Sequence, residues 1–120
     1  MVKMRPKSIF LDIDGTVFVH HGSLSDQISK APVLLSGVKE KFSEWESKGY
    51  LIILVTGRKE SMRSLTEKQL ADHGLFFDQL IMGIGGGVRV LINDLKSDAT
   101  YETAIAVNVE RNKGIADVDI

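Results

Sequence analysis

The stretch that most restricts how this chain can fold is residues 10–17, with the sequence FLDIDGTV. The apolar run at residues 8–11 predicts the end of a short buried strand, and the Gly-Thr pair after Asp14 predicts the turn that ends it. Because side chains alternate along a strand, Asp12 and Asp14 are expected to point to the same side. Two carboxylates held side by side repel each other, so a fold keeps such a pair where a cation lies between them or where one stays protonated. The stretch is therefore a candidate catalytic site.

The composition limits the class of partner. The chain has 120 residues, which is enough for one domain (1–120), and its hydrophobic and charged fractions of 43% and 26% are those of an ordinary globular protein. The net charge is -1, so no broad basic surface argues for nucleic acid, and no apolar run is long enough to span a membrane. The lack of cysteine excludes disulfides, thiolate metal sites and cysteine nucleophiles. We expect a cytoplasmic protein that binds neither nucleic acid nor membranes.

Helix and strand patterns alternate along the rest of the chain. Val38, Phe42 and Trp45 recur at helical spacing and predict an amphipathic helix over 38–48. The continuous aliphatic run at 50–55 is typical of a strand buried on both faces. The remaining patterns predict a hairpin or flap after residue 17, a loop over 23–32, a helix over 59–73, strands over 79–82, 88–92 and 104–109, and a loose tail from about 110.

This order of elements predicts an α/β fold of the Rossmann-like, doubly wound type, with a mainly parallel sheet and helices on both faces. In such sheets, ligands bind beyond the carboxyl ends of the strands. Three of the expected strands end in polar side chains, which are Asp12 with Asp14, Thr56, and Asn93 with Asp94. Parallel strands would bring these three ends to one edge of the sheet.

The glycine-rich residues 83–87 fit this scheme poorly. A right-handed crossover between parallel strands needs about a dozen residues, and five are available before the next apolar run. Either the 79–82 strand is a short edge piece or the glycines form an antiparallel or irregular turn. A nucleotide-binding loop is rejected, because Val88 stands where the last glycine of G-x-G-x-x-G is required and no helical pattern follows.

If the three strand ends meet, Asp12, Asp14 and Asp94 make an all-oxygen site, which favours Mg²⁺ over zinc or copper. Mg²⁺ keeps several waters and is readily shared with a phosphate oxygen. With such a cation present, Asp12 can attack phosphorus as a nucleophile and form an aspartyl-phosphate. Asp14 can protonate the leaving oxygen and then activate a water molecule.

Positive charge is required for this chemistry, because a carboxylate and a phosphate repel each other. Each pair of unit charges about 4 Å apart costs on the order of 4 kcal/mol at an effective dielectric constant near 20. The segment Thr56-Gly57-Arg58 offers a hydroxyl, a backbone amide and a guanidinium for a phosphoryl group, and Lys96 offers an ammonium.

Three motifs resemble those of the haloacid dehalogenase-like (HAD) phosphatase superfamily. FLDIDGTV resembles its first motif, LVTGR its second and LIND its fourth, in the same order and at similar spacing over residues 9–94. The resemblance implies a Rossmann-like fold, Mg²⁺ dependence and hydrolysis of phosphomonoesters. It makes Asp12 the nucleophile and a metal ligand, and Asp14 the acid/base and a ligand through its backbone carbonyl. Thr56 would contact the phosphoryl group, and Asp94 with Asn93 would complete the metal site.

One family feature has no counterpart. The third motif of the family is a lysine shortly before the fourth motif, and no lysine occurs between Lys68 and Lys96. Arg58, Arg89 or Lys96 could supply the charge. Because Arg89 would lie at the start of a strand, and so at the far edge of the sheet, Arg58 and Lys96 are preferred.

The sequence leaves no room for a cap domain at either of the usual insertion points of the family. The ending AIAVNVERNKGI is similar to small capless proteins of capsular or surface-polysaccharide biosynthesis. Capless relatives act on large substrates or gain a lid from a neighbouring subunit, so a homo-oligomer is an option. We expect a phosphatase of small phosphorylated metabolites such as sugar phosphates. A non-catalytic binding or regulatory domain is the alternative, and a phospho-receiver domain ranks last, because the strand at 50–55 ends in Thr56 and not in a phospho-acceptor aspartate.

Overall fold

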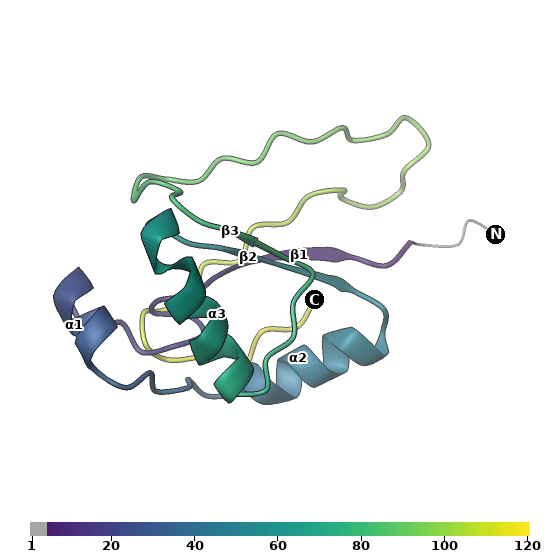
Figure 1. Ribbon diagram of the computed structural model, residues 1–120. Coiled ribbons are helices and arrows are strands. Elements are labelled where there is room, and N and C mark those ends of the chain that lie inside the picture. Colours follow the sequence, from purple (N-terminus) through teal and green to yellow (C-terminus); the bar gives the residue numbers. More distant parts are fainter. Residues whose placement is uncertain (1–4) are drawn as a thin grey trace.

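A computed structural model describes residues 5–120 of the protein and contains a three-stranded parallel sheet (Figure 1). The strands are β1 (Ser8–Asp12), β2 (Leu51–Val55) and β3 (Gln79–Ile81), in the order β1-β2-β3. Each lies within a residue or two of the strand that the sequence predicts. The predicted Rossmann-like α/β fold is confirmed at this level.

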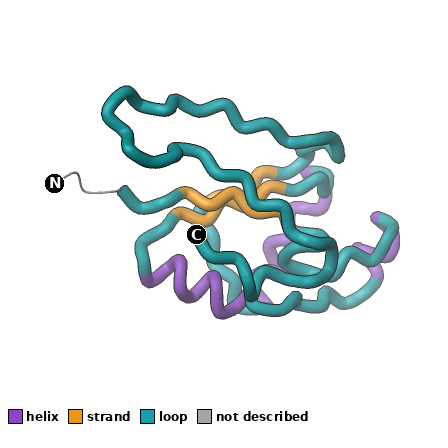
Figure 2. The backbone as a smooth tube through the Cα atoms, turned by 180° about the vertical axis from the view of Figure 1, so that it is seen from behind, coloured by secondary structure: helices purple, strands orange, loops and turns teal. Residues whose placement is uncertain are grey.

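Two helical connections join these strands. Helix α2 (Val38–Ser47) lies between β1 and β2, and a 3₁₀ turn, η1 (Glu60–Met62), leads into helix α3 (Arg63–Asp72) between β2 and β3. Both helices lie on the same side of the sheet in Figures 1 and 2, so the expectation of helices on both faces is corrected. The physical reason is that successive right-handed crossovers stepping in one direction along a sheet place their helices on one face.

The core lies between the sheet and these helices. Leu11, Leu54 and Leu80 occupy one register row across the three strands, and each is buried. The predicted helix face of Val38, Phe42 and Trp45 packs against this side of the sheet. The other face of the sheet is less covered, because Phe10 and Leu51 are 55% and 47% exposed. The alternation along β1 thus separates a packed face from an open one.

The chain after β1 forms the predicted flap, which closes at residues 17–19 and 33–35. Val19 N donates to Val33 O (2.9 Å) and Leu35 N donates to Val17 O (2.9 Å), in the manner of an antiparallel pair. Its tip contains helix α1 (Leu24–Ser29), where the sequence suggested a loop. Ser23 caps this helix, since its Oγ accepts from Asp26 N at 3.1 Å. The flap is therefore a structured element over the carboxyl end of β1.

Residues 83–109, here called the excursion, leave the sheet and contain neither helix nor strand. The predicted strands at 88–92 and 104–109 are wrong. The excursion lies on the other side of the sheet from α2 and α3 (Figures 1 and 2). The connection after β3 is too short for a right-handed crossover, so the chain runs back from the carboxyl ends of the strands instead of adding a parallel strand. It carries exposed large apolar side chains, which are Val88, Val90, Leu91, Ile92, Leu95, Tyr101, Ile105 and Val107.

The C-terminal segment, residues 110–120, was expected to be loose and is instead packed. Ile115 is 2% exposed and belongs to the core, and its backbone N donates to Ser36 O at 2.9 Å. Asn112 N donates to Gly15 O (2.9 Å), and Asn112 Oδ1 accepts from His20 N (2.7 Å). The segment therefore supports both the turn after Asp14 and the flap.

Within residues 5–120, no helix has the length and apolar character needed to cross a membrane.

Gly114 gives a stability test of this packing. It has φ +84°, and a Cβ there would collide with the carbonyl oxygen of Ser36. Strain at positive φ and overpacking together predict that Gly114→Ala lowers the free energy of unfolding by about 2–4 kcal/mol. Urea unfolding measures this loss. Gly86→Ala is the matched control, since nothing lies within 4 Å of its added Cβ, and equal stability of the two variants would contradict the prediction.

Candidate functional site

The carboxyl ends of β1 and β2 are adjacent and place two of the three predicted polar ends together. Asp12 is the register partner of Val55, so Asp14 and Thr56 follow directly beyond the same edge. Ile13 between the two aspartates is fully buried, whereas the side chains of Asp12 and Asp14 are 37% and 16% exposed. The two carboxylates lie close enough for repulsion from Asp14 to contribute to the raised pKa of Asp12.

Asp14 is held by three hydrogen bonds. Arg58 donates from Nε to Oδ2 (2.9 Å) and from Nη2 to Oδ1 (2.8 Å), which makes a bidentate ion pair. Gln27 Nε2 donates to Oδ1 at 2.7 Å. The orientation of the Asp14 carboxylate is therefore fixed from both the flap and the loop after β2.

Arg58 is buried, with 3% exposure, and its guanidinium is nearly saturated. Besides the two bonds to Asp14, Nη1 donates to Thr66 Oγ1 (3.0 Å) and Gln69 Oε1 (2.6 Å) on α3. Four of its five N–H groups are thus engaged, two to Asp14 and two to α3. The sequence predicts that this guanidinium contacts a phosphoryl group, but in the structure it lies against Asp14.

Gln27 is a site residue that the sequence analysis missed. It lies on α1, is 5% exposed, and also donates to Val19 O (3.1 Å) while accepting from His21 N (2.7 Å). One side chain therefore links the flap backbone to Asp14. The available signal was Ser23 followed three residues later by Asp26, which is the start pattern of a capped helix.

Asp12 is the more accessible carboxylate and has a cation beside it. Arg89 Nη1 lies 3.3 Å from Asp12 Oδ1, and the Arg89 side chain is 41% exposed. Burial raises the pKa of Asp12 above its usual value, Arg89 works in the opposite direction, and repulsion from Asp14 adds to the rise. The expectation that Arg89 lies at the far edge of the sheet is wrong, because the excursion starts at the carboxyl edge and not with a new parallel strand.

Thr56 and Gly57 anchor the start of the excursion. Thr56 is 1% exposed, its Oγ1 accepts from Arg58 N (3.1 Å), and its carbonyl oxygen accepts from Ile84 N (3.0 Å). Gly57 faces the same backbone, since an added Cβ would lie 3.1 Å from Ile84 O. Gly83 N also donates to Arg58 O at 2.8 Å. The loop after β2 therefore fixes where the excursion begins.

Asn93, Asp94 and Lys96 are not brought to this edge. Asn93 Nδ2 donates to Thr103 O (3.0 Å), Thr103 Oγ1 donates to Asp94 O (2.6 Å), and Lys96 N donates to Asp94 Oδ1 (3.1 Å). These bonds build an exposed turn at the outer end of the excursion, toward the amino ends of the strands (Figure 1). The physical reason is that the excursion runs away from Asp12 after Arg89.

Within residues 5–120, no group of three or more His, Cys, Asp or Glu side chains is arranged to hold a metal ion. The oxygen donors of Asp12 and Asp14 remain together at the sheet edge. Mg²⁺ is often bound by one or two carboxylates, several waters and a substrate phosphate, so this donor set fits Mg²⁺ without Asp94. The fit is to a site shared with substrate and not to a closed protein cage.

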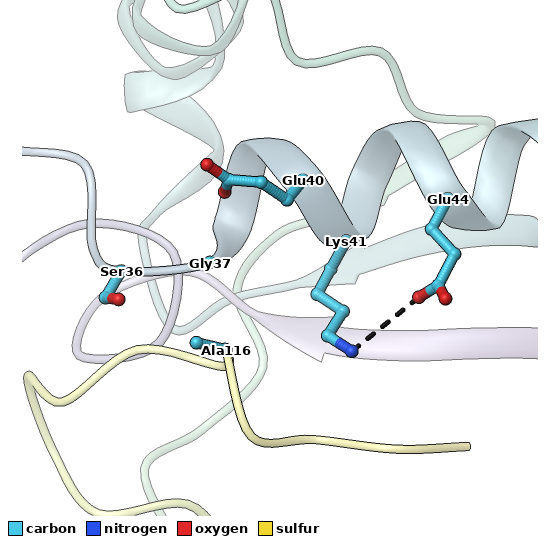
Figure 3. Close-up of a pocket in the computed structure, with 6 residues that line it drawn as sticks. All are labelled: Ser36, Gly37, Glu40, Lys41, Glu44 and Ala116. Carbon is cyan, nitrogen blue, oxygen red and sulfur yellow. Dashed lines mark ion pairs between the residues drawn. The ribbon is translucent and has the colours of Figure 1, made fainter.

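A surface pocket of about 480 Å³ lies elsewhere, along the first half of α2 (Figure 3). Glu40, Lys41 and Glu44 line one side and Ala116 the other, with a Lys41–Glu44 ion pair at 3.6 Å. None of its lining residues belongs to the sheet edge that carries Asp12 and Asp14. The pocket lies between α2 and the C-terminal segment.

The sequence matches no protein-family model and no curated protein at a significant level. Among solved structures, the chain is similar to a chain of the Pnkp1/Rnl/Hen1 complex, with a TM-score of 0.58 and 28% identity over 71% of this chain. A second structure, of the Pnkp1/Rnl/Hen1 RNA repair complex, gives a TM-score of 0.57 and 27% identity over 70% of this chain.

The chain spans 30% and 28% of the length of those two relatives. A crystal structure of a target from Vibrio cholerae gives a TM-score of 0.51 and 20% identity, covering 75% of this chain and 81% of that one. This last likeness concerns the fold alone. Together, the similarities agree with a Rossmann-like α/β fold.

Proposed function

We propose that the protein is a Mg²⁺-dependent phosphomonoester hydrolase that acts through an aspartyl-phosphate at Asp12. The observation that carries this proposal is the meeting of Asp12 and Asp14 with Thr56 and Arg58 at one sheet edge, with Asp14 clamped and Asp12 accessible. Asp14 is fixed in orientation and Asp12 is accessible, which suits a two-step phosphoryl transfer in which the two carboxylates have different roles. The resemblance of the three motifs to the HAD superfamily supports the same reaction.

The proposed chemistry divides the work between the carboxylates. Asp14 first takes up a proton from solvent at Oδ2, which accepts one hydrogen bond where Oδ1 accepts two. An Asp12 oxygen then attacks phosphorus, the bond from phosphorus to the leaving oxygen breaks, and that oxygen takes the proton from Asp14. In the second step, water attacks the phosphorus of the aspartyl-phosphate, gives a proton to Asp14, and releases phosphate with a restored Asp12. The clamp on Asp14 keeps its carboxylate oriented in both steps, which is the positioning that such transfers need.

The Asp12 carboxylate and the backbone carbonyl of Asp14 are the groups that we propose for holding Mg²⁺. When bound, the ion supplies the positive charge that offsets repulsion between a carboxylate and a phosphate. Asp94, which the motif resemblance makes a third ligand, lies in the outer turn of the excursion. The proposal therefore rests on fewer protein ligands and a more hydrated ion.

Removal of the metal tests the reaction class. A panel containing p-nitrophenyl phosphate, sugar phosphates and a short RNA with a terminal phosphate is incubated with the protein, and released phosphate is measured. RNA belongs in the panel because two similar structures come from a complex that contains Hen1 and Rnl, one of them titled an RNA repair complex. We expect turnover of small phosphomonoesters that EDTA abolishes and added Mg²⁺ restores. Absence of hydrolysis across the panel would contradict the proposal.

A second candidate is a binding or regulatory domain without turnover. It is favoured by two observations, the absence of Asp94 from the site and the ion pair that places Arg89 on Asp12. Such a domain would bind Mg²⁺ and inorganic phosphate but release no phosphate from any ester. Titration with beryllofluoride beside the turnover assay separates the two candidates.

A further inference from the structure

The carboxylate pair has two arginines beside it, and they differ in what they can still bind. Arg58 is buried and has four of its five N–H groups in hydrogen bonds within the protein. The Arg89 side chain is 41% exposed, and the ion pair with Asp12 is the one ion pair that it makes within residues 5–120. A phosphoryl group arriving at Asp12 therefore finds several available N–H donors on Arg89, whereas Arg58 has one N–H group left.

We propose that Arg89 is the residue that binds the phosphoryl group at Asp12, in the role for which Arg58 and Lys96 were the sequence-based candidates. This inference rests on the proposed function for its meaning, but the binding that it predicts is measurable without turnover. A guanidinium presents a planar fork of N–H groups that matches two phosphate oxygens, and it stays charged at all working pH values. Arg89 Nη1 lies 3.3 Å from Asp12 Oδ1, so the fork is beside the carboxylate that would attack phosphorus.

The chain around Arg89 allows it to pass from Asp12 to a substrate. The root of the excursion is fixed, because Gly83 N and Ile84 N donate to the carbonyl oxygens of Arg58 and Thr56. Between this root and Val88 stand Gly85, Gly86 and Gly87, and an added Cβ at each of the three would meet nothing within 4 Å. These glycines are not required by packing, so they supply backbone freedom next to a fixed point.

The ion pair between Arg89 and Asp12 also explains how the negative charge of Asp12 is balanced when no substrate is bound. Asp12 would otherwise lie near Asp14 with no cation of its own, since Arg58 donates to Asp14 and to α3 and makes no bond to Asp12 within residues 5–120. Arg89 neutralises Asp12 until a phosphate, with more negative charge and more oxygens, takes its place. Arg89 would therefore have two partners in turn, the nucleophile that it contacts in the structure and the phosphoryl group of the substrate.

Binding of inorganic phosphate tests this assignment. Isothermal titration is carried out in the presence of Mg²⁺ with the full chain, Arg89→Ala, Arg89→Lys and Lys39→Ala. We expect Arg89→Ala to weaken phosphate binding by about tenfold or more and Arg89→Lys to weaken it less, because lysine keeps the charge but loses the fork. Lys39→Ala removes an exposed positive charge from α2 and should bind phosphate as the unaltered chain does.

Two results would overturn the assignment. The first is unchanged phosphate affinity in Arg89→Ala. The second is a larger loss of affinity in Lys96→Ala, titrated as a further variant, than in Arg89→Ala. If the chain has turnover, Arg89→Ala should raise KM by about tenfold or more while Lys39→Ala leaves it unchanged. If the chain has no turnover, the proposed hydrolase fails, and the phosphate titration still decides whether Arg89 is the binding residue.

Discussion

Asp12→Asn is expected to reduce phosphomonoester hydrolysis on the order of 10⁴-fold or more, because an amide cannot form the aspartyl-phosphate and acts as no nucleophile. The replacement is nearly isosteric, and the Asp12 side chain is 37% exposed, so the fold should remain intact. Initial rates of phosphate release with p-nitrophenyl phosphate at saturating Mg²⁺ measure the loss. A change this large exceeds what altered substrate binding at one surface carboxylate would cause.

The control for this variant is Asp72→Asn, which changes the same group on the exposed end of α3, where it pairs with Lys68 at 2.7 Å. It should keep the rate of the unaltered chain. If Asp12→Asn also keeps that rate, then either another residue is the nucleophile or the activity comes from a contaminating enzyme. Mass spectrometry of the unaltered chain after rapid quenching offers a second readout, since the phosphoryl group should be found on Asp12 and be absent from the variant.

The second large effect concerns stability and not turnover. Arg58→Met is expected to lower the free energy of unfolding by about 3–5 kcal/mol, because it leaves the Asp14 carboxylate without its bidentate partner in a site that is 16% exposed. It also removes the donors to Thr66 and Gln69, which are buried on α3. Domains are typically stable by about 5–15 kcal/mol, so the expected loss is a large fraction of the total stability.

A double-mutant cycle separates the ion pair from the rest of the network. Asp14→Asn removes the negative charge that Arg58 neutralises, so Asp14→Asn/Arg58→Met should be less destabilised than the sum of the two single variants. Lys68→Met is a surface control, because Lys68 pairs with Asp72 and the two side chains are 70% and 58% exposed, so its loss should be much smaller. Urea unfolding followed by tryptophan fluorescence suits the unaltered chain and all four variants, since Trp45 is buried in the core. Additive losses at Asp14 and Arg58 would contradict the role given to the ion pair.

Local hydrophobic patterns were sufficient to predict the helix and the strand whose core-facing residues are neighbours in sequence. The apolar face of Val38, Phe42 and Trp45 and the run at 50–55 predicted α2 and β2, because helical spacing and continuous burial are properties of neighbouring residues. The same reasoning predicted that Asp12 and Asp14 share the edge at which Thr56 also ends. The motif at 10–17 therefore identifies the candidate site from the sequence alone.

The same patterns failed where the partner of a segment was distant. The apolar residues at 88–92 and 104–109 predicted strands, but a strand needs an edge to pair with, and the short glycine-rich connection carried them away from the sheet. The polar ending after residue 109 suggested a loose tail, yet close approach of Gly114 to Ser36 packs it against the turn after β1. Such contacts depend on the path of the whole chain.

The pairing of arginines with the two aspartates shows most clearly what the sequence determines and what the tertiary structure decides. The sequence by itself determined that the two aspartates of FLDIDGTV need positive charge, because adjacent carboxylates repel each other wherever a strand end places them. Only the tertiary structure decided that Arg58, with Gln27 from the flap, holds Asp14 and that Arg89 reaches Asp12. These partners come from three separate segments, and the side of the sheet to which each segment returns is set by crossovers and packing and not by local sequence.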